Sequence, residues 1–297
     1  MHLGGVVIAD DLLSIAPVEM SAKGFPVVQF DKDDVAALGL VKLDLLGLRM
    51  HTAIAKTLAS LRERGIELDL DRLPLDDPAT YELLRSTDTV GIFQVESPGQ
   101  RNLIGRLQPE TFADLIVEIS LFRPGPIQAD MVAPYLARRE GKEPITYPAP
   151  SLEPILRETN GIVIFQEQVL RIAHALAGYS LGEANLLRRA MTKLRTTGEM
   201  ERLRDSFIAG CLKRGVSLET AEKVWRVVSA FAGFGFCKAH AASFAFITFR
   251  SAYLKAHFPL DFYVGLLNAG YVGSYPPSVF INEARRRGYR ILGQQWE

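Results

Sequence analysis

Short apolar runs alternate with polar turn residues over the first fifty positions. The runs, rich in branched side chains, lie at 6–8, 27–30 and 40–46. Asp, Lys and Gly separate them, as is typical of short strands bounded by turns. From residue 49 the period changes, because Ile54, Leu58 and Leu61 recur at helical spacing within 49–64. The pattern predicts β structure first and a helix after it.

Beyond residue 75 the apolar positions keep the helical period almost to the end. Asp77 can cap a helix and Pro78 suits its first position, so a helical region is expected to begin here. We predict helices at 78–86, 109–121, 165–177, 181–194, 197–214, 218–232, 240–257, 260–270 and 277–288, and a strand at 289–291. The predicted fold class is α+β, a small mixed α/β part followed by a large, mainly helical part, with the boundary near residue 75.

Composition narrows the class of protein only in part. The chain has 297 residues, 48% of them hydrophobic, enough for one large domain or two medium ones. Lys+Arg and Asp+Glu both number 34, a balance that neither supports nor excludes a nucleic-acid partner. Cys211 and Cys237 lie far apart, without the spacing of a zinc site or a disulfide framework. A reduced, cytoplasmic setting is expected, and no membrane partner, because no apolar run approaches roughly 18 residues.

The two ends of the sequence predict a longer protein. Residues 6–9 form a predicted buried strand close to the first residue, and the chain stops soon after the predicted strand at 289–291. Strands need partners, so we expect both ends to be cut from something longer. A compact domain that simply starts with a strand is the alternative.

A carboxylate and an ammonium group interrupt the apolar run at 41–48. In a strand, Lys42 and Asp44 share one face, whereas Val41, Leu43 and Leu45 share the other. One interpretation is a structural ion pair that offsets the cost of desolvation. The other is an active-site strand, with Asp44 binding a metal and Lys42 facing phosphate oxygens.

Basic residues gather at two further places. Arg188, Arg189 and Lys193 lie in a strongly helical segment, and Arg189 and Lys193 are four residues apart, hence on one face. Arg123 stands directly before the rigid turn Pro124-Gly125-Pro126. Clustered guanidinium groups suit a polyphosphate, because they donate paired hydrogen bonds and supply charge. A solvated basic face is the simpler alternative for the helical group.

The order of these motifs carries more information than any one of them. The series GVVIA, QFDKDD, GLVKLDLLGL, GIFQVES, LFRPGP, IFQEQV, LLRRAMTK, FAGFGFCKAHAASFA and YLKAHFP resembles the catalytic core of the bacterial family C DNA polymerases. That family comprises the alpha subunit of DNA polymerase III and its error-prone relative. The resemblance covers nearly the whole chain with near-collinear spacing.

The resemblance implies a division into domains. Residues 1–75 would be the C-terminal part of the polymerase palm and residues 76–270 the fingers. Residues 271–297 would begin the following helix-hairpin-helix, duplex-binding region. Primer-template DNA and deoxynucleoside triphosphates are the partners that it implies. A sliding clamp and other replisome or repair subunits would bind mostly through regions outside this chain.

The resemblance also assigns roles to the charged residues. Asp44 matches the third of three palm aspartates that bind two Mg²⁺ ions, and Lys42 matches a contact to the incoming triphosphate. In the fingers the implied triphosphate contacts are Arg123, Arg188, Arg189 and Lys193. The reaction implied is two-metal phosphoryl transfer to a primer 3′-hydroxyl.

One departure from the family pattern affects the activity of this chain. The other two aspartates belong to an Asp-x-Asp block upstream of the segment that reads MHLGG here, and this sequence begins after it. We therefore expect the 297 residues alone to be inactive as a polymerase, and a non-catalytic nucleotide- and DNA-binding fragment is the second hypothesis. FCKAHAASFA, MTKLRT and SYPPSVFINEARRRG favour the error-prone branch over the replicative one.

Overall fold

The computed structural model describes residues 5–45, 47–122, 131–193, 197–232, 236–270 and 272–292, without the side chains of 191–193, 197–199 and 231–232. The chain divides into two compact units, Met1–Arg49 and Met50–Glu297. Each unit is described here by itself.

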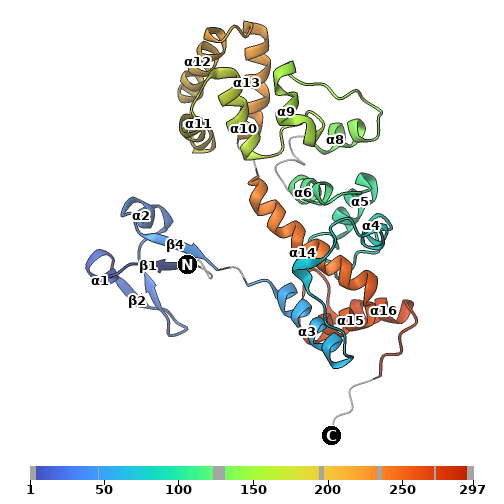
Figure 1. Ribbon diagram of the computed structural model, residues 1–297. Coiled ribbons are helices and arrows are strands. Elements are labelled where there is room, and N and C mark those ends of the chain that lie inside the picture. The colour runs from blue at the N-terminus through green and yellow to red at the C-terminus, as the bar shows by residue number, and fades with distance from the viewer. Residues whose placement is uncertain are drawn as a thin grey trace. The chain divides into compact units, whose positions relative to one another are not determined.

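Two small antiparallel ribbons build the first unit (Figure 1). In one, β1 (Gly5–Ile8) pairs with β4 (Val41–Asp44); in the other, β2 (Val18–Met20) pairs with β3 (Pro26–Val28). Two short helices accompany them, α1 (Leu12–Ile15) and α2 (Lys32–Ala37). The Asp31 carboxylate caps α2 by accepting from two backbone amides at 2.8 and 3.0 Å. These helices correct the prediction of β structure throughout the first fifty residues.

The first unit buries little apolar surface. Among its described residues only Ala16 and Val35 are buried, whereas Val6 is 43% exposed and Ile8 53%. The strand predicted at 6–9 is observed as β1, but the prediction that it is buried is wrong for this structure. The physical reason is that a two-stranded ribbon has no second layer to cover it, and so short a segment cannot enclose a core.

Helices build the second unit. They are α3 (Arg49–Glu63), η1 (Leu70–Arg72), α4 (Pro78–Arg85), α5 (Pro98–Leu107), α6 (Phe112–Leu121), α8 (Val132–Arg139), η2 (Pro150–Leu152), α9 (Glu153–Leu156), η3 (Arg157–Thr159), α10 (Gln166–Ile172), the π-helical turn η4 (Ala173–Ala177), α11 (Leu181–Lys193), α12 (Thr197–Lys213), α13 (Leu218–Ala232), α14 (Lys238–His257), α15 (Pro259–Asn268) and α16 (Pro277–Arg286). None of the described helices is long and apolar enough to cross a membrane.

Two hydrophobic cores stabilise this helical unit. The first lies between α9, α10, η4, α11, α12 and α13, with Phe207 and Trp225 among its large side chains. The second lies between α4, α5, α6, α8 and α14 and includes Tyr81, Tyr135 and Phe249. Figure 1 shows α14 as the long helix of the second core, and it packs against α6, α4 and α15. Its first residues lie beside α10, because Gln166 donates its backbone N–H to the carbonyl of Phe236 (2.9 Å).

The predicted fold class is confirmed. A small α/β unit precedes a mainly helical one, and the predicted helices from 49–64 to 277–288 match observed helices to within a few residues. Sequence reasoning missed α5, α8 and the short elements between 150 and 159. The predicted strand at 289–291 is wrong, because the structure has no strand there.

The central helix α6 buries an unpartnered carboxyl group. Glu118 is fully buried, and neither carboxylate oxygen has a hydrogen-bond partner among the described residues. Burial raises the pKa of Glu118 well above its ordinary value of 4.5, because a charge in an apolar interior is poorly solvated. The folded chain therefore favours the neutral form of this carboxyl group more than the unfolded chain does.

A pH-dependent stability follows for Glu118. The folded chain keeps the proton while the unfolded chain loses it near pH 4.5. This group's favourable contribution is therefore complete below that pH and is lost as pH rises toward the folded pKa. The loss is about 1.4 kcal/mol for each unit of pKa shift. Replacing Glu118 with glutamine should remove this pH-dependent loss of stability. Urea unfolding at pH 5 and pH 8 should therefore show that the free energy of unfolding of the variant increases, relative to that of wild type, at the higher pH. An equal difference at both pH values would contradict the neutral acid.

Candidate nucleotide-binding site

The strand β4 carries the predicted Lys42–Asp44 pair. Its register places Lys42 opposite Val7 and Asp44 opposite Gly5. The two side chains form an ion pair on one face of the strand, with Lys42 25% exposed and Asp44 57% exposed. The predicted shared face is thus observed, and with it the contact that the structural interpretation requires. Because the Asp44 carboxylate faces solvent, it also stays accessible to a ligand.

The helix α11 positions Arg188 over the start of α10. Buried Ala184 and Leu187 fix one face of α11 in the first core, which turns the next residue toward the neighbouring helix. The Arg188 guanidinium donates to Gln166 Oε1 (2.9 Å) and to Asn185 Oδ1 (3.0 and 3.2 Å). These amide oxygens, one from α10 and one from α11 itself, orient the guanidinium group of Arg188.

The other predicted arginine of α11 faces solvent. Arg189 is exposed, and the described residues offer it no ion-pair or hydrogen-bond partner. The side chain of Lys193 and the whole of Arg123 lie outside the described residues. The structure therefore places Arg188 and Arg189 side by side on α11, while the positions of the other two side chains stay predictions.

A junction between α10 and α14 adds a second cation to this region. Phe165 and Phe236 form an isolated bridge, which holds the start of α14 against the start of α10. There the backbone N–H of Lys238 donates to both oxygens of Glu167 (3.1 Å each). The Lys238 ammonium lies 5.4 Å from the centroid of the Phe165 ring and forms an ion pair with Glu158.

A row of rings runs along the exposed side of α14 from this junction. His240 lies 5.3 Å from Phe236 and 4.3 Å from Phe244, and Phe244 lies 5.3 Å from Phe93. The His240 ring is exposed, whereas Phe93, Phe236 and Phe244 are half-buried, so His240 offers the flat surface on which a planar ligand can stack. His240 lies in the first turn of α14, near the helix start that the sequence predicts at residue 240. Its ring lies between that of Phe236, which precedes the helix, and that of Phe244, one turn further along it.

The described residues do not form a metal centre by themselves. None of them belongs to a group of three or more His, Cys, Asp or Glu side chains suited to a metal ion. Asp44 is one carboxylate, and it is paired with Lys42. Two divalent ions need several shared carboxylates, so Asp44 alone does not fit the predicted Mg²⁺ pair.

Comparison with known proteins identifies the family. Residues 50–215 match the family described as the bacterial DNA polymerase III alpha subunit finger domain, and residues 1–47 match the family described as the bacterial DNA polymerase III alpha NTPase domain. Because the first match covers more than half of the chain, this chain belongs to the bacterial DNA polymerase III alpha-subunit family. The resemblance found in the sequence is confirmed.

Curated relatives agree over almost the whole chain. The chain is 46% identical over 294 residues to the error-prone DNA polymerase of Teredinibacter turnerae, covering 98% of this chain and 28% of the relative. It is 45% identical over 292 residues to that of Symbiobacterium thermophilum, covering 98% and 26%. It is 46% identical over 297 residues to that of Mycolicibacterium paratuberculosis, covering 99% and 27%. The chain thus spans about a quarter of the length of these relatives, all from the branch that the sequence favours. The palm–fingers boundary near residue 75 stays a prediction.

Proposed function

We propose that this chain is part of the catalytic subunit of an error-prone, DNA-directed DNA polymerase, to which it supplies the end of the palm and the nucleotide-binding side of the fingers. The observation that carries the proposal is the arrangement of Arg188 and Arg189 on α11. One guanidinium is held by neutral amides and the next is free of any described partner. The function itself is taken from the relatives, which are named error-prone DNA polymerases.

A triphosphate fits this arrangement for electrostatic reasons. Its oxygens accept paired hydrogen bonds from a guanidinium fork, and its charge needs several cations in one place. Arg188 supplies an oriented fork and Arg189 a mobile one. Lys238 contributes less, because Glu158 pairs with its ammonium group. We include Lys42, Arg123 and Lys193 in the proposed triphosphate contacts, on the resemblance alone.

The proposed metal ligands come partly from this chain and partly from the rest of the protein. We propose that Asp44 contributes one carboxylate to a Mg²⁺ site that carboxylates elsewhere in the full-length protein complete. Primer-template DNA and deoxynucleoside triphosphates are then the substrates, and clamp or repair subunits would bind through other parts. DNA synthesis by the full-length protein would take place in the cytoplasm.

A second function applies to the 297 residues taken alone. As a separate protein, the chain would bind nucleotide and DNA without catalysis. The observation that favours this alternative is the single carboxylate at Asp44, since a cationic triphosphate site does not need the metal pair.

Replacing Arg189 with alanine in the full-length protein is expected to weaken nucleotide use more than DNA binding. The loss of one charge-assisted contact costs about 1.5–3 kcal/mol, which corresponds to roughly a tenfold to hundredfold loss of kcat/KM for the nucleotide. Steady-state primer extension with varied nucleotide concentration measures this loss, and anisotropy of a labelled primer-template measures DNA binding in parallel.

Arg202→Ala is the matched control. Arg202 is an exposed arginine of the neighbouring helix α12 and, like Arg189, has no hydrogen-bond or ion-pair partner among the described residues. Its removal changes the net charge equally and should leave nucleotide kinetics unchanged. Unchanged nucleotide kinetics with weakened duplex binding in Arg189→Ala would reassign this residue to the DNA backbone, and absence of any templated extension by the wild-type full-length protein would refute the polymerase function.

A further inference from the structure

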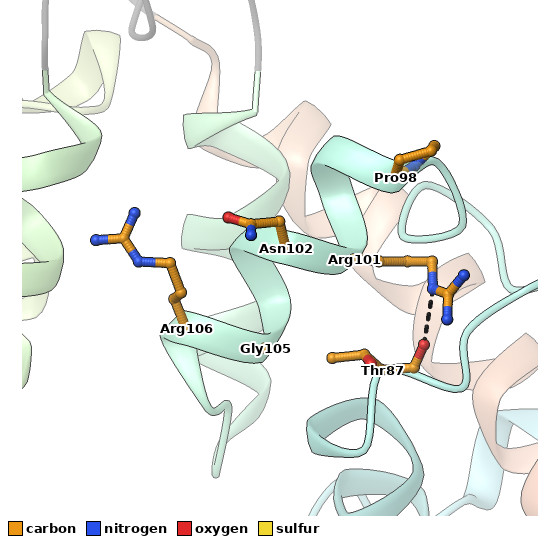
Figure 2. A pocket seen from close by; sticks show the side chains of 6 residues that line it. All are labelled: Thr87, Pro98, Arg101, Asn102, Gly105 and Arg106. Atoms are coloured by element: carbon orange, nitrogen blue, oxygen red, sulfur yellow. Dashed lines mark hydrogen bonds between the residues drawn. The ribbon is translucent and has the colours of Figure 1, made fainter.

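One face of α5 forms an open concavity with two arginines at its sides. Its volume is about 480 Å³, and its lining residues are Thr87, Pro98, Arg101, Asn102, Gly105 and Arg106 (Figure 2). At 100° per residue, Pro98, Asn102 and Gly105 share the middle of this face. Arg101 and Arg106 stand on either side of it, and Figure 2 shows their side chains extending in opposite directions.

The concavity depends on small side chains and a tight turn. A Cβ atom at Gly105 would lie 2.7 Å from Thr87 Cγ2, so only glycine lets the turn approach α5 this closely. Thr87 itself has a φ of 61°, a left-handed conformation that is unusual for a β-branched residue. The Arg101 Nε atom donates to the Thr87 carbonyl (2.9 Å), which fixes this guanidinium against the turn (Figure 2).

The charge of this face is left uncompensated. Within the described part of the chain, neither Arg101 nor Arg106 forms an ion pair, and the lining includes no carboxylate. Arg106 does act on one carboxyl group at longer range: the pKa of Glu140 is lowered by a hydrogen bond from Lys142 and, to a lesser extent, by the charge of Arg106. Glu140 pairs with Lys142, so it does not neutralise the arginine.

We propose that this face of α5 binds the phosphodiester backbone of a nucleic-acid strand. The guanidinium groups of Arg101 and Arg106 and the amide of Asn102 can donate hydrogen bonds to phosphate oxygens. Gly105 has no side chain, which leaves room for a strand to lie along the helix. The five residues from Arg101 to Arg106 advance roughly 7.5 Å along the axis, so the two arginines contact different phosphates of one strand. An open and polar concavity suits a polymer better than a small, enclosed ligand. The choice of a nucleic acid as the ligand rests on the proposed function, whereas the position of the site on α5 does not.

The test uses the 297-residue chain and a labelled single-stranded oligonucleotide. Anisotropy titrations over a series of NaCl concentrations give the affinity and its salt dependence. Removal of one phosphate contact lowers the slope of log K against log salt by about 0.7 for a single strand, which is about fivefold in affinity near 0.1 M salt. We expect this change for Arg106→Gln. Arg106 is exposed and forms no hydrogen bond or ion pair within the described part of the chain, so the variant should keep its fold, which circular dichroism would check.

Two further variants separate charge from shape. Asn102→Asp places a carboxylate between the arginines and should weaken binding at least as much as Arg106→Gln, whereas Asn102→Ala, which adds no charge, should weaken it less. Arg62→Gln is the matched control, because Arg62 is an exposed arginine on α3, far in sequence from this face; it should bind like wild type.

Several outcomes would overturn the α5 site. They are absence of salt-dependent binding by the wild-type chain, wild-type affinity in Arg106→Gln, or an equal loss in Arg62→Gln. If these substitutions weaken the binding of polyglutamate but not of DNA, the face would be assigned to an acidic protein segment instead. Primer extension by the full-length protein at saturating DNA tests the proposed function separately, since that function can hold while the α5 variants bind normally.

Discussion

Replacing Asp44 with asparagine in the full-length protein is expected to abolish primer extension while leaving DNA binding intact. Asp44 is the one carboxylate of this chain that the family resemblance assigns to the metal pair. Metal ions contribute several kcal/mol to phosphoryl transfer, so removal of a ligand should lower the rate about a thousandfold or more. Asparagine keeps the size of the side chain and can still accept a hydrogen bond from Lys42, which limits the structural disturbance. Single-turnover extension with Mg²⁺ measures the effect.

Asp33→Asn is the control for the Asp44 substitution. Asp33 is an exposed carboxylate in the same unit, within the first turn of α2, and its replacement should leave extension at the wild-type rate. The isolated 297-residue chain should not extend a primer at all. If it does, and the activity disappears in Asp44→Ala, then other carboxylates of this chain complete the site and the division proposed above is wrong.

Helices such as α13 could be predicted because they bury one apolar face, on which apolar residues recur at the helical period. The helix α14 is buried on several sides, and its long run of mostly apolar residues indicated it instead. The helix α5 was missed because Pro98, Gly99 and Gly105 lower its apparent propensity. Its start is nevertheless encoded, since Ser97 and Gln100 form a capping box.

Burial in the first unit could not be predicted from the sequence. Val6, Ile8 and Val41 have the alternation of a half-buried strand, but the two-stranded ribbon leaves them 43–56% exposed. The alternation of side chains along a strand predicts which face is apolar, but it does not predict which other elements cover that face.

For the candidate site, the sequence predicted residue types better than it predicted contacts. The ion pair between Lys42 and Asp44 follows from the two-residue period of a strand. The bond from Arg188 to Gln166 spans 22 residues and depends on how α10 and α11 pack, which no local pattern contains. The open α5 face was missed for the same reason, because the turn at Thr87 is brought there by tertiary structure.

A buried lysine ties α14 to the turn that leads into α5. Lys255 is fully buried, and its ammonium group donates to the Asp88 carbonyl (2.7 Å), the Val90 carbonyl (2.9 Å) and Asp88 Oδ1 (3.1 Å). Burial lowers the pKa of Lys255 from 10.5 to about 8, although Asp88 opposes the shift. Burial also disfavours the charge on Asp88, but Lys255 and Arg287 outweigh this effect and lower its pKa.

Replacing Lys255 with methionine is expected to destabilise the chain by about 2–4 kcal/mol, the cost of leaving buried backbone acceptors unsatisfied. The Asp88 carboxylate adds less, because it is 40% exposed and keeps Arg287 as a partner. Methionine fills a similar volume but leaves two buried carbonyl oxygens without their donor. Urea denaturation at pH 7 measures the loss. The matched control is Lys56→Met, which removes an exposed lysine of α3 and should change the free energy of unfolding by less than about 0.5 kcal/mol.

The pH dependence separates the charge of Lys255 from its packing. Between pH 8 and 10.5 the unfolded chain holds the lysine proton and the folded chain does not. The stability of wild type should therefore rise with pH through this window relative to the methionine variant, which lacks the group. Unfolding curves for both proteins are measured at about pH 7.5, below this window, and at about pH 9 and 10, inside it. The difference between the two free energies of unfolding at each pH gives the contribution of the lysine charge. A difference that stays constant with pH, or a loss of less than about 1 kcal/mol at pH 7, would show that Lys255 acts as packing and not as a buried cation.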